Sequence, residues 1–318
     1  MYLPYGESNF RKIALGNYYY IDKTTYIEKL ENSDEAYIFF LRPRRFGKSL
    51  FVSMLEYYYG IQHKDEFEDM FGNLHVGKNP TPQAHSFLIL KFDFSSIETD
   101  SYENTESGFL ENVKVAVNEF FSEYQHYAQE GDPESILEKT EPNACMKAFF
   151  SWYQKRKVTT PIYLLIDEYD HFANDLLAYR YDDFTKSTGS GGFVRTFYEV
   201  LKTATNSGII QRIFITGVTP ITLDSLTSGF NICGYRTTDL ALNDMIGFTE
   251  GEVEYLLTQV AKDRGFADFH FSAILENLRK WYNGYLFNIR AKKRIYNADM
   301  LLYFASEYAK NNFEFYPD

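Results

Sequence analysis

The chain has 318 residues, of which 45% are hydrophobic and 24% charged, so it can fold as one large α/β domain with a smaller appendage. Its formal net charge is −12, which argues against direct binding of nucleic acid by this chain alone, because such binding depends on basic residues displacing counterions from phosphates. Its two cysteines, Cys145 and Cys233, are too few and too far apart for a disulfide framework or a zinc site.

Alternating strand and helix patterns fill the first two thirds of the chain. Short apolar runs rich in β-branched and aromatic residues predict buried strands at 36–41, 86–94, 162–166 and 212–218. Helical patterns follow at 49–59, 106–124, 144–155 and 192–206. This order predicts an α/β fold in which helices cover both faces of a parallel sheet.

After about residue 221 the pattern becomes helical. We expect helices at 249–264, 272–282 and 298–310, with a turn at 282–285 between the last two. The first of them begins at Thr249-Glu250-Gly251-Glu252, which is typical of a capped helix start. We therefore expect an α/β domain over 1–240, with 1–30 leading into it, and a helical lid or accessory subdomain over 241–318.

The segment after the first strand has the features of a phosphate-binding loop. Its sequence, Arg42-Pro43-Arg44-Arg45-Phe46-Gly47-Lys48-Ser49, joins a strand to a helix, so that backbone N–H groups and the helix dipole would face an anion. We expect a nucleotide to bind at Arg44, Arg45, Phe46, Gly47, Lys48, Ser49 and Leu50. Lys48 would reach the β- and γ-phosphates and the Ser49 hydroxyl would ligate Mg²⁺. Arg42 stands where such loops usually begin with glycine, and Arg44 and Arg45 could instead pair with the protein's own carboxylates.

Two acids follow the third apolar run. A buried parallel strand presents its last carboxylate at the edge of the sheet where α/β proteins bind ligands. We expect Asp167 to hold Mg²⁺, directly or through water, and Glu168 to orient and deprotonate the attacking water. The alternatives are a strand that merely meets an acidic turn, and a separate metal site of Asp167, Asp170 and His171.

The strand at 212–218 has a hydroxyl near its carboxyl end. If this strand lies between the strands that lead to the phosphate loop and to Asp167, Thr216 could hydrogen-bond the water or the γ-phosphate. A capping or turn role for Thr216 and Thr219 is the alternative.

Five motifs in this order resemble the bacterial AAA-ATPase-like family: Tyr19-Tyr20-Ile21-Asp22-Lys23-Thr24, the phosphate loop through Leu50, Asp167-Glu168-Tyr169-Asp170, Thr216-Gly217-Val218 and Trp281-Tyr282-Asn283-Gly284-Tyr285. The resemblance implies an ASCE-type P-loop NTPase sheet, with the Thr216 strand between the loop strand and the Asp167 strand, and arginine is usual there at the first loop position. It also implies that Arg236 could contact the γ-phosphate in a neighbouring subunit, with a surface ion pair as the alternative. A PD-(D/E)XK nuclease-like domain often follows in that family, but we recognise none in this chain.

The function expected from these residues is Mg²⁺-dependent binding and hydrolysis of ATP. A nucleotide-gated switch with little turnover, controlling a downstream effector domain, would use the same residues, and a non-enzymatic module with a degenerate loop is the third reading. ATP is the expected ligand; a homo-oligomer and a nuclease-like domain in a longer chain stay open. Residues 1–7 lack a signal-peptide pattern and no apolar run approaches ~18 residues, so we expect a cytoplasmic protein without a membrane span.

Overall fold

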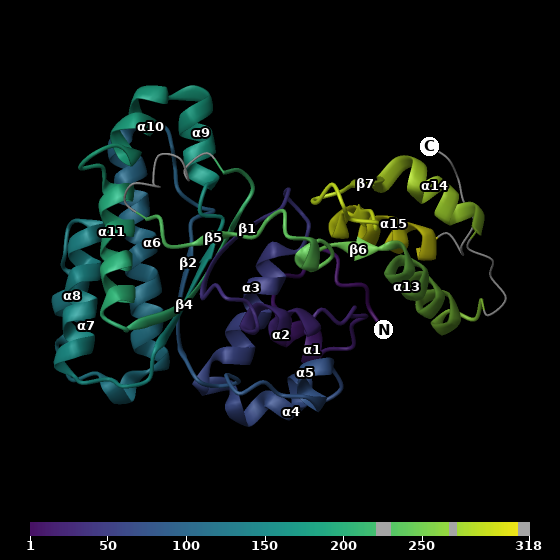
Figure 1. The fold of residues 1–318 in the computed structure, drawn as a ribbon, viewed down its shortest axis with the longest axis horizontal. Coiled ribbons are helices and arrows are strands. Elements are labelled where there is room, and N and C mark those ends of the chain that lie inside the picture. Colours follow the sequence, from purple (N-terminus) through teal and green to yellow (C-terminus); the bar gives the residue numbers. More distant parts are fainter. Residues whose placement is uncertain (221–229, 267–271, 311–318) are drawn as a thin grey trace.

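The computed structural model describes residues 1–220, 230–266 and 272–310. At its centre is a parallel sheet with the strand order β2-β3-β4-β1-β5 (Figure 1). The strands are β1 Tyr37–Leu41, β2 Leu88–Asp93, β3 Ile162–Asp167, β4 Ile210–Gly217 and β5 Gly234–Tyr235. Because β4 pairs with both β1 and β3, the expected place of the Thr216 strand is confirmed. The first four strands match the predicted runs, whereas β5 has two residues and leaves no pattern in the sequence.

Both faces of the sheet are covered, which explains why its strands are mostly apolar. Along β1 the side chains alternate, with Phe39 and Leu41 in one core and Ile38 and Phe40 in the other. The first core is covered by α6 Tyr102–Glu123, α7 Asp132–Leu137, α8 Pro142–Lys155, α9 His171–Tyr179, α10 Tyr181–Thr188 and α11 Phe193–Asn206. The second is covered by α1 Phe10–Leu15, α2 Thr25–Glu31, α3 Lys48–Tyr59, α4 Phe67–Phe71 and α5 His75–Lys78. Figure 1 shows these two groups of helices on opposite sides of the strands.

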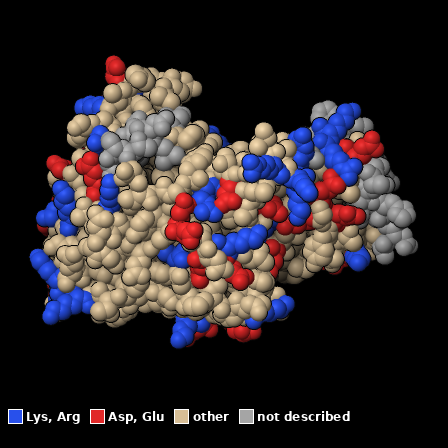
Figure 2. Space-filling view, viewed as in Figure 1, with Lys and Arg blue, Asp and Glu red and all other residues tan. Residues whose placement is uncertain are grey.

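The C-terminal lobe, residues 248–310, contains a small sheet as well as the predicted helices. Its elements are β6 Phe248–Thr249, α13 Glu250–Asp263, α14 Ser272–Tyr282, β7 Asn283–Tyr285, β8 Ile295–Tyr296 and α15 Ala298–Lys310. The strands pair antiparallel in the order β6-β8-β7. The turn expected at 282–285 is therefore wrong, since 283–285 form β7, and strands this short show no alternation. Residues 311–318 of the expected subdomain lie outside the described residues. Figure 2 shows the same view with its charged side chains.

The start of α13 has the cap that the sequence predicts. The Thr249 hydroxyl accepts from the backbone N–H of Glu252, and the Glu252 carboxylate accepts from the backbone N–H of Thr249. This reciprocal pair satisfies two of the N–H groups that a helix start leaves without partners.

The N-terminal segment connects the sheet to this lobe. Tyr19 packs in the apolar core of the lobe, and its hydroxyl donates to the Asp263 carboxylate at 2.6 Å. The Lys23 ammonium donates to both carboxylate oxygens of Glu252, at 2.6 and 2.8 Å, and burial lowers the pKa of Lys23. The motif that contains Tyr19 and Lys23 is thus a link between the two parts. None of the described helices is long and apolar enough to cross a membrane.

Candidate functional site

The conformation of Gly47 and the buried side chain of Phe46 hold the phosphate loop in place. Gly47 has φ 98°, a left-handed conformation, and a Cβ built there would meet only Ile246, at 3.9 Å. Backbone conformation, and not lack of space, therefore favours glycine at this position. Phe46 is buried with its ring edge-on to Tyr285 and Phe287, at centroid distances of 4.8 and 5.5 Å. Phe46 can therefore contribute to a phosphate only through its backbone.

Arg42 is a structural anchor and not a phosphate ligand. Its side chain is 1% exposed, and its guanidinium stacks on Phe40 and Phe287, 4.1 and 3.7 Å from the ring centroids. It donates to the backbone carbonyls of Leu41, Thr237, Leu242 and Asn243. Burial lowers its pKa to about 9. The sequence marks this role only by an arginine where glycine is usual.

The structure brings together the residues predicted to act on phosphate, metal and water. The Lys48 side chain is 3% exposed, and its ammonium lies 3.1 Å from a carboxylate oxygen of Glu168. The Ser49 hydroxyl lies close enough to the Asp167 carboxylate, at the end of β3, to lower the pKa of that carboxyl. Glu168 has φ 49°, a strained backbone of the kind that gathers at functional sites. The loop and the acidic pair therefore form one site, as the strand order requires.

Ser49 and Asp167 fit a magnesium ion. Mg²⁺ takes oxygen ligands, and in nucleotide sites it uses one or two protein groups together with phosphate oxygens and water. A hydroxyl and a carboxylate that lie beside each other provide such a pair. No cluster of three metal-binding side chains occurs within the described ranges, so the separate site considered for Asp167, Asp170 and His171 finds no support.

Asp170 instead holds the chain after β4. Its buried carboxylate accepts from the backbone N–H groups of Val218 and Thr219 and from the Thr219 hydroxyl. The Thr219 hydroxyl therefore has the local hydrogen-bonding role that was the alternative for it. Thr216, on β4 opposite Phe40 of β1, is fully buried, and its hydroxyl has no hydrogen-bond partner among the described residues. Its predicted contact with water or phosphate stays a prediction.

The arginines predicted to assist are exposed or paired. Arg236 forms ion pairs with Glu35, at 3.2 Å, and with Asp239. This is the ion-pair alternative named for it, and a contact with a neighbouring subunit stays a prediction. Arg44 is exposed, and Arg45 lies 3.3 Å from Asp299 of α15.

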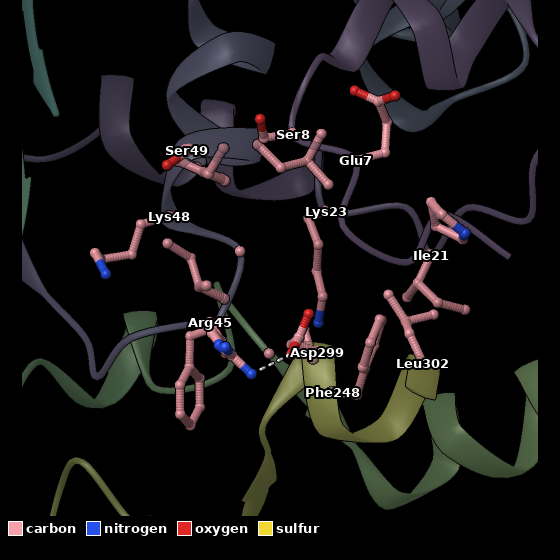
Figure 3. Close-up of a pocket in the computed structure, with 18 of the residues that line it drawn as sticks. Glu7, Ser8, Ile21, Lys23, Arg45, Lys48, Ser49, Phe248, Asp299 and Leu302 are labelled. Atoms are coloured by element: carbon pink, nitrogen blue, oxygen red, sulfur yellow. Dashed lines mark hydrogen bonds and ion pairs between the residues drawn. The ribbon is translucent and has the colours of Figure 1, made fainter. Parts of the chain in front are cut away.

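A cavity of about 250 Å³ opens beside the loop, between the N-terminal segment and the C-terminal lobe. In Figure 3, Lys48 and Ser49 lie on one side of it, Phe248 and Leu302 on another, and the Arg45–Asp299 pair between them. Ile21, Leu50 and Met54 add apolar lining, and Glu168 adds a carboxylate. The cavity thus combines a charged end with an apolar body. No sequence pattern marks the lining from the lobe, because it comes from parts far apart in the chain.

The ionised carboxylate of Asp167 lowers the stability of the folded protein. Burial is the main cause that raises its pKa to about 6, with Glu168 and Asp93 adding to it and the Ser49 hydrogen bond opposing it. A carboxyl whose pKa is raised by folding destabilises the folded state above that pKa, and the cost disappears as pH falls below the ordinary value near 4.

We therefore expect Asp167→Asn to stabilise the protein without nucleotide or metal. The expected gain in the free energy of unfolding is roughly 3 kcal/mol at pH 8 and about half of that at pH 5. Urea denaturation at both pH values measures it, with Asp65→Asn as the control at an exposed carboxylate. A variant less stable than the wild type at pH 8 would contradict the assigned cost.

Comparison with known proteins agrees with this geometry. Residues 4–227, more than half of the chain, match the family AAA-ATPase_like, described as predicted AAA-ATPase. The chain belongs to this family. A curated relative of this AAA-ATPase-like protein is an uncharacterized protein in the vnfD 5′ region of Azotobacter chroococcum mcd 1, 26% identical over 306 residues. That match covers 95% of our chain and 51% of the relative, so the chain spans about half the length of the relative.

The AAA-ATPase-like fold is also that of a solved structure. The Walker-type ATPase Paby2304 of Pyrococcus abyssi superposes with a TM-score of 0.51 and 12% identity, over 91% of this chain and 67% of that one. This likeness supports the fold alone. Family and fold together identify the protein as a P-loop ATPase in architecture.

Proposed function

We propose that this protein binds ATP with Mg²⁺ and hydrolyses it. The observation that carries the proposal is that Lys48, Ser49 and Glu168 line one end of a cavity with an apolar body, with Asp167 buried beside Ser49. ATP matches this cavity, because its triphosphate is charged and its base is planar and largely apolar on its faces. The backbone N–H groups at the start of α3 suit the phosphates, and Ile21, Leu50 and Phe248 suit the base.

The ion pair between Lys48 and Glu168 suggests how binding prepares the reaction. In the structure the ammonium has the carboxylate as its partner at 3.1 Å. A bound β- or γ-phosphate would take over Lys48, since it offers more negative charge, and would leave Glu168 free to accept a proton from water. Magnesium held by Ser49 and Asp167 would neutralise charge on the phosphates when bound.

A nucleotide-gated switch is the second candidate, and specific contacts favour it. The backbone carbonyl of Arg44 accepts from the Asn297 side chain at 3.1 Å, and that of Arg45 accepts from the backbone N–H of Asp299 at 3.1 Å. Both donors lie at the start of α15, so a change in the loop would reach the C-terminal lobe. A steady-state turnover measurement separates a switch from an efficient hydrolase.

The proposal also includes the domain division, the cellular compartment and the assisting residues expected from the sequence. We propose the division at 240/241 between ATPase domain and lid, the cytoplasm as the compartment, and Arg236 and Thr216 as assisting groups in an oligomer. A relative about twice as long leaves room for the downstream effector domain that a switch would control.

The proposal is tested by replacing the loop lysine. Lys48→Ala should weaken ATP binding roughly 10–100-fold, because charge-assisted contacts contribute about 1.5–3 kcal/mol each. Calorimetry with Mg²⁺·ATP measures the affinity, and thermal unfolding checks that the variant folds. Lys78→Ala is the matched control, since Gly77-Lys78 repeats the dipeptide at the end of the short helix α5. Equal ATP affinity in the Lys48 variant would show that the loop does not bind phosphate.

A further inference from the structure

The loop between β7 and β8, residues 286–294, concentrates positive charge in a strongly acidic chain. Arg290, Lys292, Lys293 and Arg294 place four positive charges within five residues, and all four residues are exposed. The chain as a whole has a net charge of −12. Figure 2 shows Lys and Arg gathered over the part of the C-terminal lobe that Figure 1 labels β7 and α14. We call residues 286–294 the basic loop.

Among the described residues, only Lys293 of these four cations has a carboxylate partner. Lys293 approaches Asp244 only to 3.7 Å, and Arg294 donates to the backbone carbonyl of Gly284. Within the described part of the chain, neither Arg290 nor Lys292 has a hydrogen-bond or ion-pair partner for its side chain. These two cations are therefore available to an external anion.

Exposed apolar side chains lie among these cations. Ile289 is 98% exposed, Leu286 41% and Tyr285, at the end of β7, 38%. The Tyr285 ring stacks on Phe287, with 6.0 Å between centroids and 17° between planes, so its orientation is held by packing. Cations beside a fixed aromatic ring are the combination that binds single-stranded nucleic acid, where phosphates pair with the cations and bases stack on the ring.

We propose that the basic loop binds single-stranded nucleic acid through its phosphate backbone. A polyphosphate chain offers a density of negative charge that gains from counterion release at every neutralised phosphate, whereas an acidic protein segment offers fewer and more flexible charges. A lipid surface would need a broad apolar face, and here the exposed apolar residues sit on one loop. Repulsion from the acidic remainder is screened beyond about 8 Å at physiological salt. The acidic net charge argues against binding of nucleic acid over the whole surface. Because of this screening, it does not prevent binding at one local basic site.

The basic loop is joined directly to the phosphate loop. The Asn243 amide accepts from the backbone N–H of Phe287 and donates to the backbone carbonyl of Lys293, at 3.3 Å each, so one side chain holds both ends of the basic loop. Phe287 in turn lies against the guanidinium of Arg42, the first residue of the phosphate loop. A strand bound to the basic loop would thus lie beside a residue, Phe287, that packs on the phosphate loop.

The test is a binding measurement on the whole chain without nucleotide, so that its result does not depend on ATP hydrolysis. Fluorescence anisotropy follows a labelled oligo(dT) of about 30 nucleotides at several salt concentrations. Arg290→Glu/Lys292→Glu should weaken binding at least about tenfold. It should also reduce the slope of log affinity against log salt by about 1.4, since each phosphate contact on a single strand contributes ~0.7.

The matched control reverses the same number of charges elsewhere. Lys64→Glu/Lys78→Glu, at exposed positions just before α4 and at the end of α5, should bind as the wild type does. Unchanged affinity in the basic-loop variant, or equal loss in the control, would overturn the site. Phosphatidylserine vesicles or poly-glutamate bound more tightly than oligo(dT), with the same dependence on Arg290 and Lys292, would assign the loop to a membrane or an acidic protein and overturn the proposed ligand. Thermal unfolding of both variants confirms that each one is folded.

Discussion

Glu168→Gln should leave ATP bound and slow its hydrolysis by about 10²–10⁴-fold, the usual contribution of a positioned general base. In activation free energy this is roughly 3–5 kcal/mol. Glutamine keeps the shape of the side chain and one acceptor oxygen but cannot take the proton from water. The structure adds a second expectation. Glu168 pairs with Lys48 at 3.1 Å, so a neutral side chain in its place competes less with phosphate for Lys48, and ATP affinity should be equal or higher.

The experiment pairs two variants, because the two neighbouring acids have different roles. Asp167→Asn should weaken Mg²⁺-dependent binding as well as hydrolysis, since Asp167 lies beside the proposed metal ligand Ser49. Calorimetry gives the ATP affinity and single-turnover kinetics gives the chemical rate. If Glu168→Gln lost ATP while Asp167→Asn retained it, the two roles would be reversed. If Glu168→Gln hydrolysed ATP normally, another residue would be the general base. Asp170 would be the next candidate by position, but its carboxylate already accepts hydrogen bonds from the backbone N–H groups of Val218 and Thr219.

The central sheet could be predicted because its strands are long enough to show their burial. The four runs read from the sequence correspond to β1–β4, and the helices between them begin within a few residues of the predicted positions. Strand order came from the family resemblance and not from periodicity, since no local pattern says which strands pair. Once that order is given, Lys48, Ser49, Asp167 and Glu168 must meet at one edge of the sheet, and they do.

What could not be predicted depends on contacts between distant segments. The cavity wall opposite the phosphate loop comes from Ile21, Phe248 and Leu302, which share no motif. Strands β5 to β8 have two or three residues each, too few for a pattern. The pairing of Arg236 with Glu35 and Asp239 was one of two open readings, because spacing alone does not show which carboxylates lie within reach.

Replacing Arg42 by glycine, the residue with which phosphate loops in general begin, should destabilise this protein. In Arg42→Gly four backbone carbonyls lose a buried charged donor, and Phe40 and Phe287 lose the plane that separates them. Buried carbonyls without partners cost about 1–3 kcal/mol each when water cannot reach them, and partial relaxation reduces the sum. We expect a loss of roughly 3–5 kcal/mol in the free energy of unfolding, which lowers the melting temperature by about 5–7 °C.

Arg44→Gly is the matched control for this substitution, since Arg44 lies two residues away on the same loop and is exposed. Without nucleotide it should cost no more than about 1 kcal/mol, the usual penalty for added backbone freedom. Urea denaturation and thermal unfolding of both variants measure the difference. If Arg42→Gly were as stable as the wild type and bound ATP more tightly, Arg42 would not stabilise the loop and would instead weaken its binding of phosphate. The structure implies the opposite, because the arginine holds residues 237–243 and Phe287 against the loop, and the loop keeps its shape through them.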